Sequence, residues 1–112
     1  MSTTEAHNWI AAYSPETISP DSWIRIEPTD SLRKLINPKM SLENVFHFSP
    51  EIKGKAAFSD NGRFIDFYPA QGELREGCTY ECCLNMSSLS GVKSMNDFRF
   101  TFNVERREVK MC

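Results

Sequence analysis

The chain has 112 residues, of which 40% are hydrophobic and 25% charged, and its formal net charge is −2. This length suits one domain with a hydrophobic core of its own, and the composition is that of a folded protein rather than a disordered one. A net negative charge without clustered basic residues argues against a nucleic-acid or anionic-membrane partner. No apolar run approaches the ~18 residues of a membrane span, so we expect no direct membrane insertion.

Short segments of alternating apolar and polar residues recur along the chain, each bounded by turn-forming residues. The clearest is the last, in which Phe98, Phe100, Phe102 and Val104 alternate with polar residues. Seven strands are predicted, at residues 9–13, 23–27, 45–48, 55–58, 63–68, 78–85 and 98–104. Together with eight Phe, three Tyr and two Trp residues, this pattern favours β structure. The predicted fold class is all-β, a seven-stranded antiparallel Ig-like β-sandwich.

The ends of the chain carry weaker signals. The first residues lack the pattern of a secretory signal peptide, a basic segment followed by an apolar one. Two interpretations stay open: a cytosolic protein, or a domain of a longer secreted protein. We expect a disordered N-terminal segment at residues 1–8, the Ig-like β-sandwich at residues 9–104, and at residues 105–112 an extended tail toward a following domain.

Three connections between strands suggest specific structures. Asn61-Gly62 between two apolar runs is a strong hairpin signal, because both residues tolerate a positive φ. Residues 31–35 could form a helical turn with Ser31 as its N-cap. The loop at residues 86–96 carries apolar side chains at one end of the sandwich. It either binds a partner or folds back over the open end of the core.

The segment 74–80 suggests a tyrosine corner. Leu74 is followed by Gly77 in a turn and by Tyr80 near the start of a strand. In a tyrosine corner the hydroxyl bonds to the backbone a few residues upstream and stabilises the crossing between two sheets. The alternative is an ordinary core tyrosine beside a glycine turn.

The alternation also predicts the core. Truncation of one of its phenylalanines, such as Phe100, should cost about 3–5 kcal/mol. The predicted core residues are Ile10, Ile24, Ile26, Phe46, Phe48, Ile65, Phe67, Leu74, Tyr80, Cys82, Leu84, Phe98, Phe100 and Phe102.

The four cysteines form no recognisable disulfide framework. Cys78 and Cys82 lie in one predicted strand, where residues four apart are ~13 Å distant, too far for a disulfide. We expect Cys82 to be a small core residue and Cys83 to face outward. Cys112 could link two chains in an oxidising buffer. A catalytic cysteine needs an electropositive, partly exposed setting, which this pattern does not suggest, so no enzyme activity is predicted.

Metal ligands are few. His7 and His47 are the two histidines, and a zinc or copper site needs three or four converging ligands. We therefore assign no catalytic, cofactor-binding or metal residues and expect no cofactor, although a small copper-binding sandwich stays open as an alternative. Four acidic residues near turns lack the spacing of a calcium site and are expected to form a solvated rim: Asp60, Asp66, Glu73 and Glu76.

Several segments, in this order, are similar to a known pattern. They are Ile-Ser-Pro-Asp-Ser-Trp-Ile-Arg-Ile at 18–26, Phe-His-Phe-Ser-Pro-Glu-Ile-Lys-Gly-Lys-Ala at 46–56, Ile-Asp-Phe-Tyr-Pro at 65–69, Leu-Arg-Glu-Gly-Cys-Thr-Tyr at 74–80 and Phe-Arg-Phe-Thr-Phe at 98–102. As a set covering roughly residues 10–104, they resemble the N-terminal Ig-like (macroglobulin-type) module of bacterial alpha-2-macroglobulin family proteins.

The resemblance implies a non-enzymatic structural or interaction module of a protease-trapping protein. Such proteins are lipoproteins of the cell envelope that face the periplasm. The implied partners are neighbouring domains of a longer chain and, through the parent protein, proteases or envelope proteins. The family's reactive thioester motif has no counterpart after Cys78, Cys82 or Cys83, so no thioester role is implied. A generic bacterial Ig-like adhesin module is a further alternative.

Overall fold

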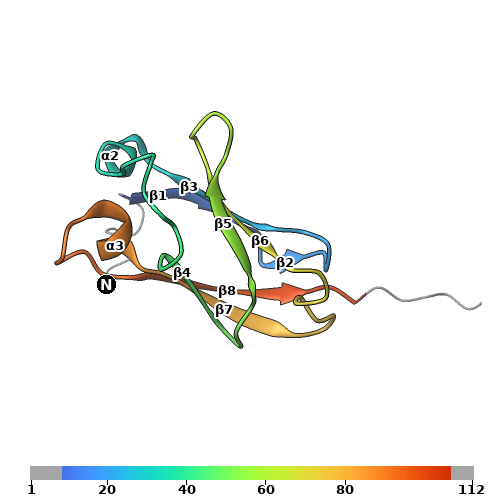
Figure 1. The fold of residues 1–112 in the computed structure, drawn as a ribbon. Coiled ribbons are helices and arrows are strands. Elements are labelled where there is room, and N and C mark those ends of the chain that lie inside the picture. Colours follow the sequence, from blue (N-terminus) through green and yellow to red (C-terminus); the bar gives the residue numbers. More distant parts are fainter. Residues whose placement is uncertain (1–8, 107–112) are drawn as a thin grey trace, which may run out of the picture.

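The computed structural model describes residues 9–106, which form two facing β-sheets (Figure 1). Two short helices lie entirely within these residues, α2 (Asp30–Arg33) and α3 (Met86–Ser90). The eight strands of the same region are β1 (Ile10–Tyr13), β2 (Thr17–Ile18), β3 (Ile24–Pro28), β4 (Phe46–Ser49), β5 (Gly54–Phe58), β6 (Ile65–Pro69), β7 (Thr79–Leu84) and β8 (Phe98–Val104).

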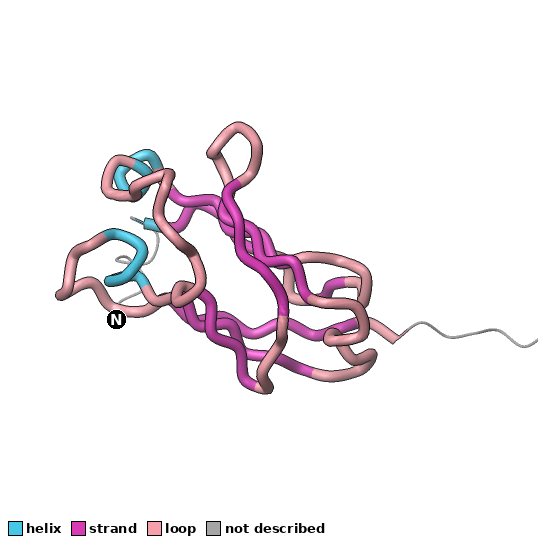
Figure 2. The backbone as a smooth tube through the Cα atoms, in the orientation of Figure 1, coloured by secondary structure: helices cyan, strands magenta, loops and turns pink. Residues whose placement is uncertain are grey.

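The strands form a β-sandwich of two four-stranded layers, visible edge-on in Figure 2. One sheet has the order β1-β3-β6-β5 and the other the order β2-β8-β7-β4. The predicted all-β class is therefore confirmed. The domain is elongated, with extents of 54 × 29 × 22 Å. The start of β1 and the end of β8 lie at opposite ends of its long axis (Figure 1).

The predictions of seven strands and of a purely antiparallel arrangement are wrong. The additional strand is β2, which pairs in parallel with β8 through Thr17↔Asn103 and Ile18↔Val104. Backbone hydrogen bonds from Asn103 N to Glu16 O (2.7 Å) and from Glu105 N to Ile18 O (2.9 Å) attach it. A strand this short displays no alternation, so the sequence pattern could not reveal it.

The core lies between the two sheets and contains the predicted residues, with one correction. Phe48 is only half-buried, because it lies on the edge strand β4; its ring still packs 4.7 Å from that of Phe67. The other predicted core residues are all buried. The sequence pattern missed further buried residues outside regular alternation: Ile18, Leu32, Leu42, Val45, Ile52, Met86, Leu89 and Met95.

The tyrosine corner is confirmed. The buried hydroxyl of Tyr80 accepts a hydrogen bond from Arg75 N (3.0 Å) and donates one to Glu73 O (3.2 Å). Gly77 completes the turn with φ +76°, a conformation that side chains rarely adopt. The corner joins β6 in one sheet to β7 in the other.

The hairpin at Asn61-Gly62 is confirmed, but its turn is longer than a two-residue turn. β5 and β6 pair from Gly54↔Pro69 to Phe58↔Ile65, and residues 59–64 connect them. Gly62 has φ +71°, whereas Asn61 does not have a positive φ. Instead, the Asn61 side chain accepts hydrogen bonds from Arg63 N (2.9 Å) and Ser59 Oγ (2.8 Å).

The other two connections pack against the sandwich. The N-cap of α2 is Thr29, whose Oγ1 accepts from Leu32 N at 3.3 Å, so the prediction of Ser31 as the cap is wrong. Leu32 is fully buried. A helix that begins after Thr29 directs this side chain into the core. The 86–96 loop folds back over the core, because the side chains of Met86 and Leu89 are buried.

Candidate interaction surfaces

The residues that could bear chemistry do not converge. His47 is exposed on β4, with its Nε2 atom 3.1 Å from Asn44 O. Across residues 9–106, no group of three or more His, Cys, Asp or Glu side chains is arranged to hold a metal ion. His7 and Cys112 lie outside the described residues.

The described cysteines are free thiols in different settings. Cys82 is fully buried, as predicted, and burial raises the pKa of its thiol, which disfavours a nucleophilic thiolate at neutral pH. Cys83 is half-exposed on the opposite side of β7, with Sγ 3.8 Å from Asp97 Oδ2. Cys78 is also half-exposed.

Asp66 does not belong to a solvated rim, and this prediction is wrong. Its side chain is completely buried on the outer side of β6. The Arg25 guanidinium donates to it twice, through Nε to Oδ1 and Nη2 to Oδ2, both at 2.9 Å. The Tyr68 hydroxyl donates to Oδ2 at 3.2 Å. Asp60 and Glu76, in contrast, are exposed as expected.

Aromatic rings surround this ion pair. The Arg25 guanidinium carbon lies 4.3 Å from the centre of the Phe64 ring and 5.5 Å from that of Trp23. The Trp23 and Tyr68 rings are 6.3 Å apart, and these residues are 42% and 45% exposed. We call the surface formed by Trp23, Arg25, Phe64 and Tyr68 the aromatic face. It lies on the outer side of the β1-β3-β6-β5 sheet.

The charges of the aromatic face are fixed by Asp66. Its hydrogen bonds raise the pKa of Arg25, so the guanidinium stays a cation. Burial, and then the Asp66 carboxylate, raise the pKa of Tyr68, so the phenol stays neutral at physiological pH. Two shallow hollows flank Arg25, one of about 280 Å³ beside Tyr13 and Trp23 and one of about 330 Å³ beside Asp60 and Tyr68. The aromatic face can therefore offer stacking surfaces and one cation to a partner.

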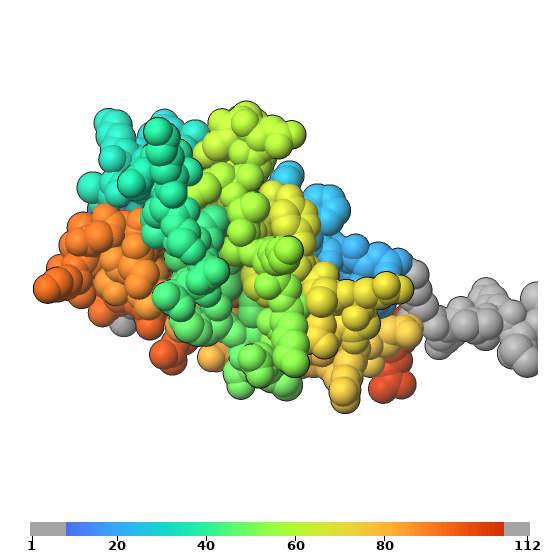
Figure 3. Space-filling model, viewed as in Figure 1, coloured from blue at the N-terminus to red at the C-terminus, as the bar shows by residue number. Residues whose placement is uncertain are grey.

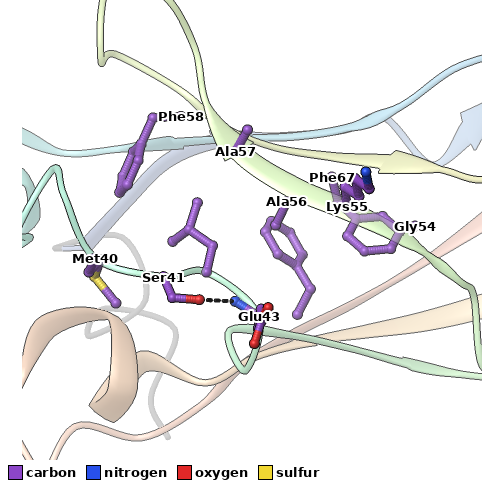
Figure 4. Close-up of a pocket in the computed structure, with 11 residues that line it drawn as sticks. Met40, Ser41, Glu43, Gly54, Lys55, Ala56, Ala57, Phe58 and Phe67 are labelled. Atoms are coloured by element: carbon purple, nitrogen blue, oxygen red, sulfur yellow. Dashed lines mark hydrogen bonds between the residues drawn. The ribbon is translucent and has the colours of Figure 1, made fainter.

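A second surface lies along the free edge of β5. A groove of about 690 Å³ separates this strand from the segment 40–43, with Phe46 and Phe67 also lining it (Figure 4). The segment before β4 and strand β5 lie side by side in the space-filling view (Figure 3). We call this hollow the edge groove.

Gly54 permits the close packing at one end of the edge groove. A Cβ atom at this position would clash with the carbonyl oxygen of Tyr68 and would lie 2.8 Å from the Phe67 ring. Only a glycine therefore allows the ring of Phe67 and strand β5 to approach so closely.

Neither surface was predicted, although one signal was present. Arg25 and Asp66 are directly opposite each other on neighbouring strands, and each stands between two apolar residues. Opposite charges at such positions indicate a cross-strand pair once the strand order is known. The edge groove had no comparable signal, because it depends on where the segment 40–43 folds.

Comparison with protein-family models, curated proteins and solved structures finds no match to this chain. In the described residues there is also no helix with the length and apolar character needed to cross a membrane. The topology and the two surfaces are therefore the features of the molecule that indicate a function.

Proposed function

We propose that the chain is an Ig-like module that acts by binding and spacing rather than by catalysis. The strand order carries this proposal. The sheets β1-β3-β6-β5 and β8-β7-β4 correspond to the strand orders A-B-E-D and G-F-C of a constant-type Ig domain, with β2 added beside β8. Tyr80 precedes Cys82 by two positions, as the tyrosine of the corner precedes the second cysteine of Ig domains.

The module lacks the disulfide of antibody domains and stabilises its sheets differently. Cys82 is a free thiol, and β3 carries isoleucines at its buried positions. Across the sandwich, the Phe67 ring of β6 contacts the Phe48 and Phe46 rings of β4, at 4.7 Å and 5.5 Å between centroids. Such pairs contribute about 0.5–1.5 kcal/mol each beyond simple burial. Reduced cysteines therefore do not prevent stable packing of the two sheets.

Within this class we propose the N-terminal macroglobulin-type module of a bacterial alpha-2-macroglobulin-like envelope protein, located in the periplasm or at the cell envelope. The order of motifs in the sequence supports it, including the tyrosine corner at 74–80. The elongated shape, with β1 beginning and β8 ending at opposite ends, also suits a module in a row of domains. Its partners are then the neighbouring domains of the parent chain.

The aromatic face is the proposed contact with a neighbouring domain. Trp, Tyr and Arg are the residues that most often carry binding energy at protein interfaces. Asp66 holds Arg25 in place before any partner binds, so little conformational entropy is lost on association. The exposed rings of Trp23 and Tyr68 would become buried in that contact.

The test compares the chain alone with the longer protein that its gene encodes. In the single module with Trp9 replaced by Phe, acrylamide quenching reports on Trp23 alone. In the longer protein, the difference in quenching between the parent and its Trp23→Phe variant isolates the signal of Trp23. We expect Trp23 to be quenched freely in the single module and shielded in the longer protein. A second measurement is thermal unfolding of the longer protein with Trp23→Ala. Its control is Arg99→Ala, which changes an exposed residue on the other sheet. Equal quenching in both proteins would exclude the aromatic face as the contact, and a gene that ends with this chain would exclude the macroglobulin assignment.

A further inference from the structure

The free edge of β5 has unused backbone hydrogen-bonding groups. β5 is the last strand of its sheet and pairs only with β6. The bonds Ser59 N to Phe64 O (2.9 Å) and Ala70 N to Lys53 O (2.7 Å) fix the pattern of this ladder. Hydrogen-bonded and non-bonded residue pairs alternate along antiparallel strands, so the backbone N–H and C=O groups of Lys55 and Ala57 bond to β6. The N–H and C=O groups of Gly54, Ala56 and Phe58 therefore point away from β6, into the edge groove.

The opposite wall of the edge groove does not satisfy these groups. In the segment 40–43 and next to it, the hydrogen bonds are local: Met40 N to Asn37 O (3.0 Å), Glu43 N to Ser41 Oγ (3.3 Å) and Val45 N to Leu42 O (3.2 Å). The buried side chain of Leu42 anchors this segment to the core. Among the described residues, no bond joins it to the edge of β5. An unpaired strand edge of this kind is a template for another strand.

The space suits an extended chain rather than a compact molecule. The edge groove of about 690 Å³ lies between two walls, and β5 forms one of them along its whole length (Figure 4). Gly54 and Ala56 have minimal side chains, so a second backbone can approach β5 closely. Adding a strand to an exposed edge is an established mode of peptide recognition.

We propose that the edge groove binds an extended segment of a partner protein as an added strand on β5, with apolar residues at alternate positions and an acidic residue opposite Lys55. Ala56 and Phe58 face the core and are half-buried, so residues placed opposite them enter the apolar space beside Phe46 and Phe67. Lys55 faces water, and the residue opposite it does too. A carboxylate there complements the lysine. This contact is separate from the aromatic face.

The proposal is tested by NMR titration of the full chain with two synthetic peptides. One alternates valine and threonine, and the other has aspartate at the central threonine position. We expect the amide signals of Gly54, Ala56 and Phe58 to shift and their hydrogen exchange to slow with both peptides. The aspartate peptide should bind about fivefold more tightly, and Lys55→Glu should abolish this preference. Lys93→Glu, an exposed change far along the chain, is the control and should leave the preference unchanged.

Ala56→Pro removes one outward N–H without removing a bond to β6, so binding of both peptides should be lost. If this variant fails to fold, the Lys55→Glu comparison still decides the proposal. Absence of shifts at these three amides at millimolar peptide would overturn it. Concentration-dependent dimerisation of the unmodified chain through the same amides would also overturn it, because the edge would then bind a second copy.

Discussion

The carboxylate of Asp66 lies beneath the guanidinium of Arg25 and accepts two hydrogen bonds of 2.9 Å from it. The two partners are not equivalent, because the Asp66 side chain is 0% exposed and the Arg25 side chain 41%. Removal of the Arg25 side chain would leave the buried Asp66 carboxylate without its cation. Removal of the carboxylate would leave a cation that water can reach.

This asymmetry predicts unequal effects of two substitutions. Arg25→Met should lower the free energy of unfolding by about 3 kcal/mol, since it leaves the buried carboxylate without a cation. Asp66→Asn should lower it by about 1–2 kcal/mol. Urea unfolding at neutral pH measures both, and Asp60→Asn, on an exposed residue, should change stability by less than about 0.5 kcal/mol. A larger cost for Asp66→Asn than for Arg25→Met would contradict this explanation.

Tyr68 should make the stability of the domain depend on alkaline pH. Burial and the Asp66 carboxylate raise the pKa of Tyr68, so the folded state holds the phenol proton more tightly than the unfolded state. The resulting stability is fully present below the unfolded pKa of about 10 and is lost as the pH rises through the folded pKa. Urea unfolding from pH ~8 to ~11 should show this decline, and Tyr68→Phe should reduce it. An identical decline in both proteins would assign it to other groups.

The tyrosine corner should contribute to stability through its hydroxyl. Tyr80→Phe keeps the ring but removes the hydrogen bonds to Arg75 N and Glu73 O. We expect a loss of about 1–2 kcal/mol in denaturant unfolding, because both backbone groups lose their partner. Tyr13→Phe is the matched control, since Tyr13 is 51% exposed. Equal effects of the two changes would mean that the corner does not stabilise the crossing.

Phenylalanine truncation should distinguish the core from its edge. Phe100→Ala should cost about 3–5 kcal/mol, because this side chain is 8% exposed and packs 4.7 Å from the Tyr13 ring and 6.3 Å from that of Phe102. Phe48→Ala should cost less, because Phe48 is half-buried on the edge strand β4. Thermal unfolding gives the order of the two effects. The reverse order would show that the edge rings between β4 and β6 stabilise the sandwich more than burial indicates.

The sequence predicts the long strands well because their period of two is a local property. The alternation around Phe100 identifies β8 and its buried face without any knowledge of neighbouring strands. β2 could not be predicted, since its pairing with β8 is made by residues far apart in the chain. The same limit applies to the N-cap of α2, where Thr29 and Ser31 are both suitable residue types and only the position of the core distinguishes them.

The candidate surfaces were less predictable for a related reason. Alternation assigns Asp66 to the outer side of β6 correctly, and an outer side normally faces water. Here the side chains of Arg25 and Tyr68 bond to it, and Arg25 comes from another strand, β3. The edge groove depends on both the end of a sheet and the path of the segment 40–43, and neither is a property of any short stretch of sequence.

The parallel pairing of β2 with β8 has a mechanical consequence. β1 belongs to one sheet and β2 to the other, so the first part of the chain is attached to both layers. Because β1 begins and β8 ends at opposite ends of the long axis, tension applied through the two ends loads the bonds between β2 and β8 in shear. Even after β1 detaches, the bonds at Asn103 and Glu105 must break together rather than one after another. The shortest strand of the sandwich is therefore the one that holds the module closed under a pulling force.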